Sequence, residues 1–220
     1  MKTILAFETS TATLTVALGT REGKIRELRS TGAFKHSENL IPLIDRLLKK
    51  ERLSASDIDA FAMDRGPGSF TGLRIGFSLL KGFLAARKRP CYGAVSLDMM
   101  THSIVLPEGR RLGVFMDARR DKIYSRFYRF EKSKWAAEGR LEVLTLSELL
   151  PRISKGTVLV GDGLERYKEK VKVRTVFPCA RTLVEWFQKR DSRLTLLKTP
   201  RDFSPLYFRA SEAEEKRRSQ

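Results

Sequence analysis

The chain has 220 residues, of which 41% are hydrophobic and 31% are charged. This composition excludes disordered and fibrous proteins and is typical of a soluble globular protein with one domain or two small ones. Its 43 lysines and arginines outnumber 26 aspartates and glutamates, and the resulting net charge of +17 raises the affinity for polyanions such as RNA.

The N-terminal sequence leads directly into a strand pattern and has no signal-peptide architecture. No apolar run reaches the roughly 20 residues that a membrane-spanning helix needs. The two cysteines, Cys91 and Cys179, lie far apart without metal or redox spacing. We therefore expect a cytoplasmic protein that has no membrane partner.

The first half of the chain alternates short apolar strands with helices. Residues 37–50 are predicted to form a helix whose inward face includes Leu40 and Ile41, with Pro42 in its first turn. The remaining predictions in this half are strands at 3–7, 13–18, 24–30, 58–63 and 91–95, and helices at 70–87 and 96–103.

A loop at residues 107–111 indicates a boundary between two domains, 1–106 and 107–220. Beyond it the pattern predicts strands at 112–116, 122–130 and 157–160, and helices at 145–150 and 181–190. Each half opens with an apolar strand that ends in an acid, Glu8 or Asp117, followed by a short turn and a second strand. This similarity indicates a duplicated α/β unit, and the C-terminal tail could cross back to the first domain.

The most informative segment is residues 66–76, Gly-Pro-Gly-Ser-Phe-Thr-Gly-Leu-Arg-Ile-Gly, between a predicted strand and a predicted helix. A glycine-rich turn at the start of a helix exposes backbone N–H groups at the positive end of the helix dipole, so Gly68 and Ser69 are candidates for an anion site. Ser69 also suits an N-cap, which explains it without chemistry. The segment could bind a phosphate, a protein partner or both.

The helix predicted at 70–87 is apolar on two faces, and such a helix must be buried on both. One face has the spacing of a helix packed on its own sheet, and it consists of Phe70, Leu73, Phe77, Leu80 and Leu84. The second face begins with two glycines four residues apart, and it consists of Gly72, Gly76, Leu79, Phe83 and Ala86. The glycine face could pack inside its own domain, but we favour contact with another subunit. Glycines cost roughly 1 kcal/mol each in a helix interior, and close packing of another backbone is a reason for keeping them.

The residues offer no catalytic or metal-binding set. His36 and His102 are the only histidines, so neither a three-histidine site nor an H-E-x-x-H motif is available. Ser69 does not stand in a G-x-S-x-G motif. We predict no catalytic residues and no metal, and we disfavour a peptidase.

The sequence resembles that of the TsaB (YeaZ) family, whose members are bacterial subunits for tRNA threonylcarbamoyladenosine synthesis. The match at residues 66–76 is long and specific, and the resemblance covers most of the chain. Supporting stretches are residues 7–11, 36–44, 117–119 with 122–124, 161–163 and 205–209. The resemblance implies an α/β fold of two actin-like (ribonuclease H-like) domains, each a mixed sheet with flanking helices.

The resemblance also implies a function and partners. The chain would be a non-catalytic interaction or scaffold subunit that supports a TsaD-like catalytic subunit, which adds threonylcarbamoyl to the adenosine next to the tRNA anticodon. A TsaE-like ATPase and a second copy of the chain are further expected partners, with contacts through first-domain helices that include Leu40, Ile41 and the glycine face. We expect tRNA to bind through the complex, helped by basic residues such as Lys216, Arg217 and Arg218.

Actin-like ATPases hold phosphates and metal-bound water with an Asp-Gly hairpin in each domain, and this sequence departs from that pattern. Its first hairpin has Glu8-Thr9-Ser10, and its second has Arg119 where a glycine would admit phosphate. We therefore expect no resident cofactor, only a weak anion site at Thr9, Ser10, Gly68 and Ser69, and ATP binding that is weak or confined to the complex. The alternative function is a weak nucleotide-binding ATPase or kinase of the same fold.

Overall fold

The computed structural model describes residues 2–20, 23–31 and 35–208. They form two compact units, one made of residues 1–99 and 178–206 and the other built on residues 100–177. The predicted boundary after residue 106 differs from this division, in which the first unit breaks off after residue 99, and residues 178–206, predicted to lie in the second domain, belong to the first unit. The predicted tRNA-contacting residues Lys216, Arg217 and Arg218 lie outside the described residues.

The first unit is built on a six-stranded mixed sheet with the order β10-β5-β4-β1-β2-β3. β1 is antiparallel to β2 and parallel to β4, which is parallel to β5. The strands are β1 (Thr3–Glu8), β2 (Thr13–Thr20), β3 (Arg26–Thr31), β4 (Ala60–Asp64), β5 (Cys91–Ala94) and β10 (Thr195–Leu196).

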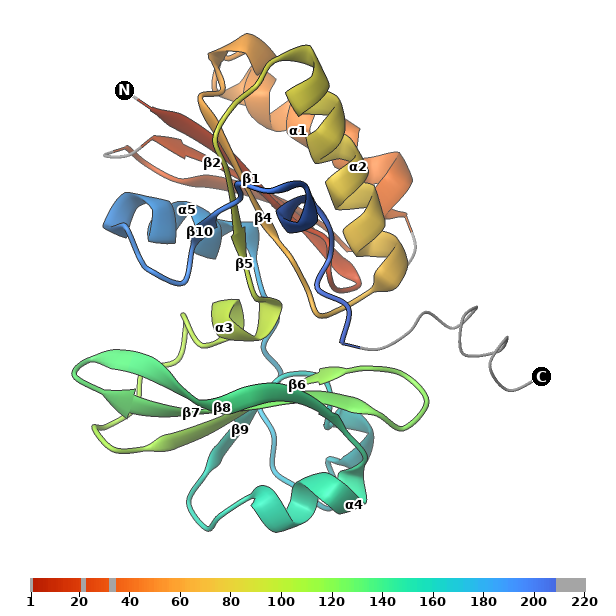
Figure 1. Cartoon of the computed structure of the whole chain (residues 1–220), viewed down its shortest axis with the longest axis vertical. Coiled ribbons are helices and arrows are strands. Elements are labelled where there is room, and N and C mark those ends of the chain that lie inside the picture. Colours follow the sequence, from red (N-terminus) through yellow and green to blue (C-terminus); the bar gives the residue numbers. More distant parts are fainter. Residues whose placement is uncertain (1, 21–22, 32–34, 209–220) are drawn as a thin grey trace. The chain divides into compact units, whose positions relative to one another are not determined.

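Helices cover both faces of this sheet (Figure 1). α1 (His36–Lys50) and α2 (Phe70–Ala86) pack on one face, and α5 (Ala180–Lys189) packs on the other. Successive residues of β1 point to opposite faces, so Leu5 and Phe7 join the core under α1 and α2, whereas Ile4 and Ala6 join the core under α5. A short α3 (Ser96–Met100) follows β5.

α5 explains why residues 178–206 belong to the first unit. Its apolar side chains Leu183, Val184 and Trp186 are fully buried against β1, β2 and β4. Thr15 Oγ1 accepts a hydrogen bond from the N–H of Ala180 at 2.8 Å, and β10 then pairs with β5.

The second unit is a four-stranded mixed sheet with the order β8-β7-β6-β9. Its strands are β6 (Arg111–Asp117), β7 (Ile123–Glu131), β8 (Lys134–Leu144) and β9 (Val158–Val160). The short helix α4 (Leu146–Leu149) lies between β8 and β9 in the chain. Four single-turn 3-10 helices complete the described secondary structure: Ala55–Asp57, Leu150–Arg152, Glu165–Tyr167 and Pro200–Phe203. β8 is not predicted from the sequence, because only one of its eleven residues is buried and its apolar residues do not alternate regularly.

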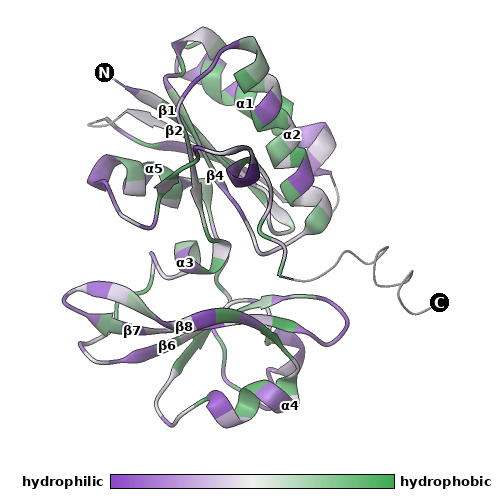
Figure 2. Ribbon diagram, viewed as in Figure 1, coloured by the Kyte–Doolittle hydropathy of each residue, from purple (hydrophilic) through white to green (hydrophobic). Residues whose placement is uncertain are grey.

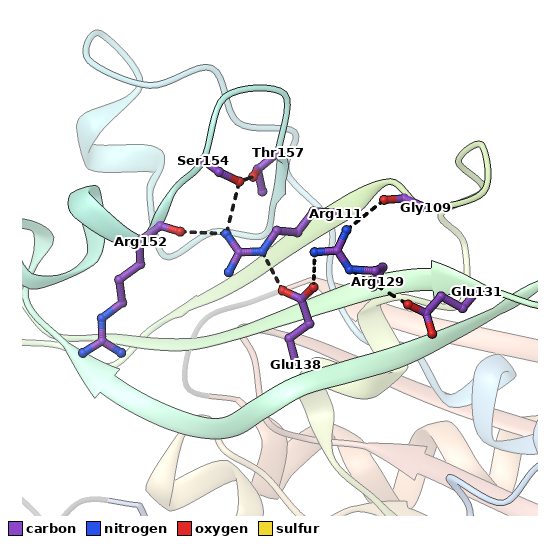
Figure 3. A network of polar contacts seen from close by, with 8 residues as sticks. All are labelled: Gly109, Arg111, Arg129, Glu131, Glu138, Arg152, Ser154 and Thr157. Atoms are coloured by element: carbon purple, nitrogen blue, oxygen red, sulfur yellow. Dashed lines mark hydrogen bonds and ion pairs between the residues drawn. The ribbon is translucent and has the colours of Figure 1, made fainter.

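Two arginines on the second sheet share one carboxylate. Arg111 and Arg129 lie opposite each other on β6 and β7. The carboxylate of Glu138 on β8 accepts from Arg111 and contacts Arg129, at 2.6 Å in each case (Figure 3). The Arg111 guanidinium also donates to the carbonyl of Arg152 and lies 4.0 Å from the centre of the Phe127 ring. One carboxylate thus offsets the repulsion between two facing cations.

No helix among the described residues is long and apolar enough to cross a membrane. α1 and α2 carry hydrophobic residues toward the sheet and hydrophilic ones elsewhere (Figure 2). The strands and helices predicted from the sequence are present with ends shifted by a few residues; α3, for example, ends at Met100 instead of residue 103.

The burial of α5 predicts that Leu183→Ala lowers the free energy of unfolding of the first unit by about 2–5 kcal/mol, because it leaves a cavity among fully buried side chains. Urea unfolding followed by the fluorescence of the neighbouring Trp186 measures this change. Leu196→Ala is the matched control, since this leucine lies in the same segment but is 43% exposed, and we expect less than about 1 kcal/mol. Equal effects of both changes would contradict the placement of α5.

Candidate functional site: the turn between β1 and β2

Two carboxylates lie side by side at the carboxyl ends of parallel strands. Glu8 ends β1 and Asp64 ends β4, and both are fully buried. Glu8 Oε1 accepts hydrogen bonds from the N–H and the hydroxyl of Ser10, at 2.6 and 2.5 Å. Asp64 Oδ1 accepts from the N–H of Thr9 at 3.0 Å. These contacts attach the β1–β2 turn, Thr9 to Ala12, to the ends of both strands.

Half of each carboxyl group has no partner. Glu8 Oε2, Asp64 Oδ2 and the hydroxyls of Thr9 and Ser96 are buried without a hydrogen-bond partner among the described residues. Burial raises the pKa of Glu8 well above its ordinary value, and the negative charge of Asp64 raises it further. Burial likewise raises the pKa of Asp64 to about 7. Two buried, neighbouring negative charges repel each other, so near neutral pH the pair holds at least one proton.

The β1–β2 turn docks on the N-terminus of α2. The carbonyl oxygen of Ser10 accepts a hydrogen bond from the N–H of Ser69 at 2.6 Å, and the hydroxyl of Ser69 accepts from the N–H of Gly72 at 3.2 Å. The backbone of Ser10 also lies so close to Gly68 that a Cβ there would overlap it. The predicted residues Thr9, Ser10, Gly68 and Ser69 therefore lie together, but an anion would compete with Ser10 for the Ser69 N–H.

The same turn accounts for the glycines of α2. A Cβ at Gly72 would overlap the carbonyl oxygen of Thr9, and a Cβ at Gly76 would lie 2.7 Å from Thr9 Oγ1 and 3.2 Å from Met63 Cε. Both glycines are buried. The close approach expected from the glycine spacing exists, but the backbone near Gly72 and the side chains near Gly76 belong to the same unit. Assigning Gly72 and Gly76 to an intermolecular interface was wrong.

The other predicted interface residues have mixed positions. Leu40 is buried in the core, and Leu79 and Phe83 are partly buried against it, with Phe83 stacked on Phe61 at 4.9 Å between ring centres. Ala86 is exposed at the end of α2. Ile41 was expected to point inward, but 61% of it is exposed. A one-residue step on a helix turns a side chain by about 100°, which is enough to bring it from the core to the surface.

His36 also contacts the β1–β2 turn. Its ring Nε2 lies 2.8 Å from the carbonyl oxygen of Thr11, to which it donates in the matching tautomer, and burial lowers its pKa. This contact spans 25 positions of the chain and is not predicted from the sequence. Within residues 2–20, 23–31 and 35–208, no group of three or more His, Cys, Asp or Glu side chains could hold a metal ion.

The second hairpin, between β6 and β7, has two arginines in its turn and a third bonded to Asp117. Three consecutive residues, Arg119, Arg120 and Asp121, have positive φ angles, so the turn is tight although it lacks glycine. The Asp117 carboxylate accepts from the Arg119 N–H at 2.9 Å and from Arg166 at 2.8 Å. Behind it, Asp162 accepts from the N–H of Asp117 at 3.2 Å, and burial raises the pKa of Asp162.

The chain is similar in sequence to a described protein family and to several named proteins. A family model described as "TsaD: tRNA N6-adenosine threonylcarbamoyltransferase" matches residues 31–173. The "tRNA threonylcarbamoyladenosine biosynthesis protein TsaB" of Escherichia coli (strain K12) is 30% identical over 76% of this chain and 74% of its own length. The protein of the same name from Bacillus subtilis (strain 168) is also 30% identical, over 76% of this chain and 67% of its own.

Solved structures agree on the fold. "YeaZ from Pseudomonas aeruginosa" superposes with a TM-score of 0.75 at 25% identity, covering 94% of this chain and 100% of its own. A second structure from Pseudomonas aeruginosa, with "similarity to peptidase YEAZ" in its description, has a TM-score of 0.76 at 24% identity and covers 95% of this chain and 100% of its own. The predicted fold of two actin-like domains with mixed sheets is confirmed.

The contact between Thr9 and α2 predicts opposite effects for two changes in one helix. Gly72→Ala lowers the melting temperature of the isolated protein by several degrees, because the added Cβ displaces the turn backbone. Gly82→Ala, where no atom lies within 4 Å, raises it slightly, because alanine stabilises a helix by up to roughly 1 kcal/mol over glycine. Differential scanning calorimetry distinguishes them. If Gly72→Ala were also stabilising, the glycine would not face its own unit.

The buried pair predicts a pH dependence of stability. The folded-state pKa of Asp64 is about 7 and that of Glu8 is also raised, so both lie above their unfolded values. Folding therefore takes up protons, and the resulting stability is present at low pH and is lost as pH rises through 7. We expect the free energy of unfolding of the first unit to fall by about 1–3 kcal/mol between pH 5 and 8.

Glu8→Gln tests whether the buried carboxyl pair causes this pH dependence. Glutamine has the shape of protonated glutamate, and its side-chain oxygen still accepts hydrogen bonds from Ser10. Urea titrations at several pH values should show a shallower fall, with the variant at least as stable as the parent at pH 8. Glu38→Gln, at an exposed position of α1, is the control and should keep the parent slope. A parent whose stability rises from pH 5 to 8 would show that the pair is ionised in the folded state.

Proposed function

The chain belongs to the TsaB family, and from that membership we propose that it is a subunit of the complex that adds threonylcarbamoyl to the adenosine next to the tRNA anticodon. The observation that carries this proposal is 30% identity to the Escherichia coli TsaB protein over 76% of this chain, combined with a superposition on YeaZ along 94% of it. A role in tRNA modification also supports a cytoplasmic location.

The subunit's role in this proposal is to bind and support a TsaD-like catalytic subunit, without catalysis of its own. Support comes from the candidate site, where several of the polar groups are bonded to one another. The Ser69 N–H is bonded to Ser10, the Glu8 carboxyl to Ser10 and the Asp64 carboxyl to Thr9. A reacting group would have to displace these internal contacts first.

A resident nucleotide is not part of the proposal. In the first unit the Ser10 carbonyl competes for the helix N-terminus, and in the second unit Arg119 lies beside Asp117 at 3.4 Å. ATP bound weakly, or only within the complex, remains compatible with this arrangement. The ATPase or kinase alternative would require both hairpins to open.

The partner surface that we propose is the exposed side of α1 and α2, and it includes Ile41 in place of the glycines. This surface combines an exposed isoleucine with the exposed end of α2 at Ala86, and Leu79 and Phe83 reach it in part. A second copy of the chain would use the same surface, and contact with a TsaE-like ATPase is proposed from the resemblance alone.

Ile41→Asp tests the surface. A charge within an apolar contact should weaken binding of the TsaD-like subunit at least about tenfold, while an exposed substitution leaves the fold intact. Light scattering gives the mass of the protein alone and of its mixture with the TsaD-like subunit, and circular dichroism checks the fold.

Val105→Asp is the matched control, because Val105 is 83% exposed and lies in the second unit. It should leave binding unchanged. Equal binding by the parent and Ile41→Asp would exclude this surface, and a parent that does not bind the TsaD-like subunit would refute the proposed function.

A further inference from the structure

A row of basic side chains leads from the 3-10 helix Glu165–Tyr167 to one edge of the second sheet. Arg174 lies next to Val160 of β9 in a parallel bridge, and its N–H donates to the carbonyl of Leu159 at 3.0 Å. From residue 170 to 174 burial alternates along the chain: the side chains of Val171 and Val173 pack against the core, and those between them are exposed. The exposed residues are Lys170, Lys172 and Arg174, with Lys168 just before them. We call these four residues the basic row.

The basic row has no acidic partners among the described residues. None of its four side chains takes part in an ion pair there, in contrast to Arg111 and Arg129, which share the carboxylate of Glu138 (Figure 3). Of the two acids close in sequence, Glu165 accepts a hydrogen bond from the Thr175 hydroxyl, and Glu169 is exposed beside Lys168 and Lys170. Residues 165–175 therefore carry five basic side chains against two acidic ones.

The apolar side of the segment fixes the direction of the lysines. Val171 and Val173 pack against the core, and the side chains of Lys170, Lys172 and Arg174 on either side of them are exposed to solvent. Lysine is a flexible point charge that binds phosphate without reading a base, so such a row suits a backbone and not a sequence.

We propose that the basic row binds the phosphate backbone of tRNA. The inference rests on the proposed function, which supplies the polyanion, and it deepens that function by giving this chain a direct RNA contact in its second unit. The row differs from the C-terminal residues Lys216, Arg217 and Arg218, which lie outside the described residues. Recognition is electrostatic, so it depends steeply on salt and little on tRNA sequence.

The test is the binding of an unmodified tRNA transcript to the full chain, measured by fluorescence anisotropy between 50 and 200 mM KCl. The triple variant Lys168→Gln, Lys170→Gln, Lys172→Gln should bind at least about tenfold more weakly at the lowest salt. The slope of log affinity against log salt should decrease by about two to three, one for each lost phosphate contact.

A matched control removes the same charge elsewhere. Lys24, Lys134 and Lys198 are exposed and lie in three separate segments. Their triple change to glutamine should alter the affinity less than about threefold. Equal losses in both variants would mean that tRNA senses only net charge, and would overturn the proposal. Unchanged affinity in the row variant, or no binding by the parent, would overturn it as well.

The mass of each variant mixed with the TsaD-like subunit separates this proposal from the proposed function. The row variant should still bind that subunit. If it lost the subunit and kept its tRNA affinity, the row would be a protein contact and the proposal would be wrong. If the parent itself failed to bind the subunit, the proposed function would fail independently of the tRNA result.

Discussion

The first unit depends on the docking of the β1–β2 turn against the starts of two helices. The carbonyl of Ser10 accepts from the N–H of Ser69 at the start of α2, and the carbonyl of Thr11 faces His36 at the start of α1. Gly72 and Gly76 allow α2 to approach Thr9 closely. Helix termini need such partners when they are buried. The turn therefore positions both helices on the sheet and connects them to the ends of β1 and β4.

This arrangement connects the fold with the proposed role. In an actin-like nucleotide site a turn and a helix N-terminus would be free for phosphate, whereas here their polar groups are bonded to each other. The Glu8 and Asp64 carboxyls are buried at the same place, where charge is costly and a shared proton is favoured.

The described basic residues of the second unit fall into two groups, those paired with carboxylates and those that are not. Arg111, Arg129 and Arg166 are held by carboxylates and stabilise the second unit. Within the described part of the chain the basic row has no such partners, and it alternates with two valines that pack against the core. A net charge of +17 alone identifies no binding surface; the pairing of individual side chains distinguishes structural cations from those available to RNA.

The sequence by itself determined the family, the α/β alternation, the capping role of Ser69 and the need for a close backbone approach at Gly72 and Gly76, because each follows from local spacing and residue type. Only the tertiary structure decided which backbone approaches those glycines, that residues 178–206 complete the first unit, and that Ile41 faces solvent. The partners of these residues are dozens of positions away or are set by the rotation of a whole helix. Local patterns carry no information about such contacts, which form only when the chain folds.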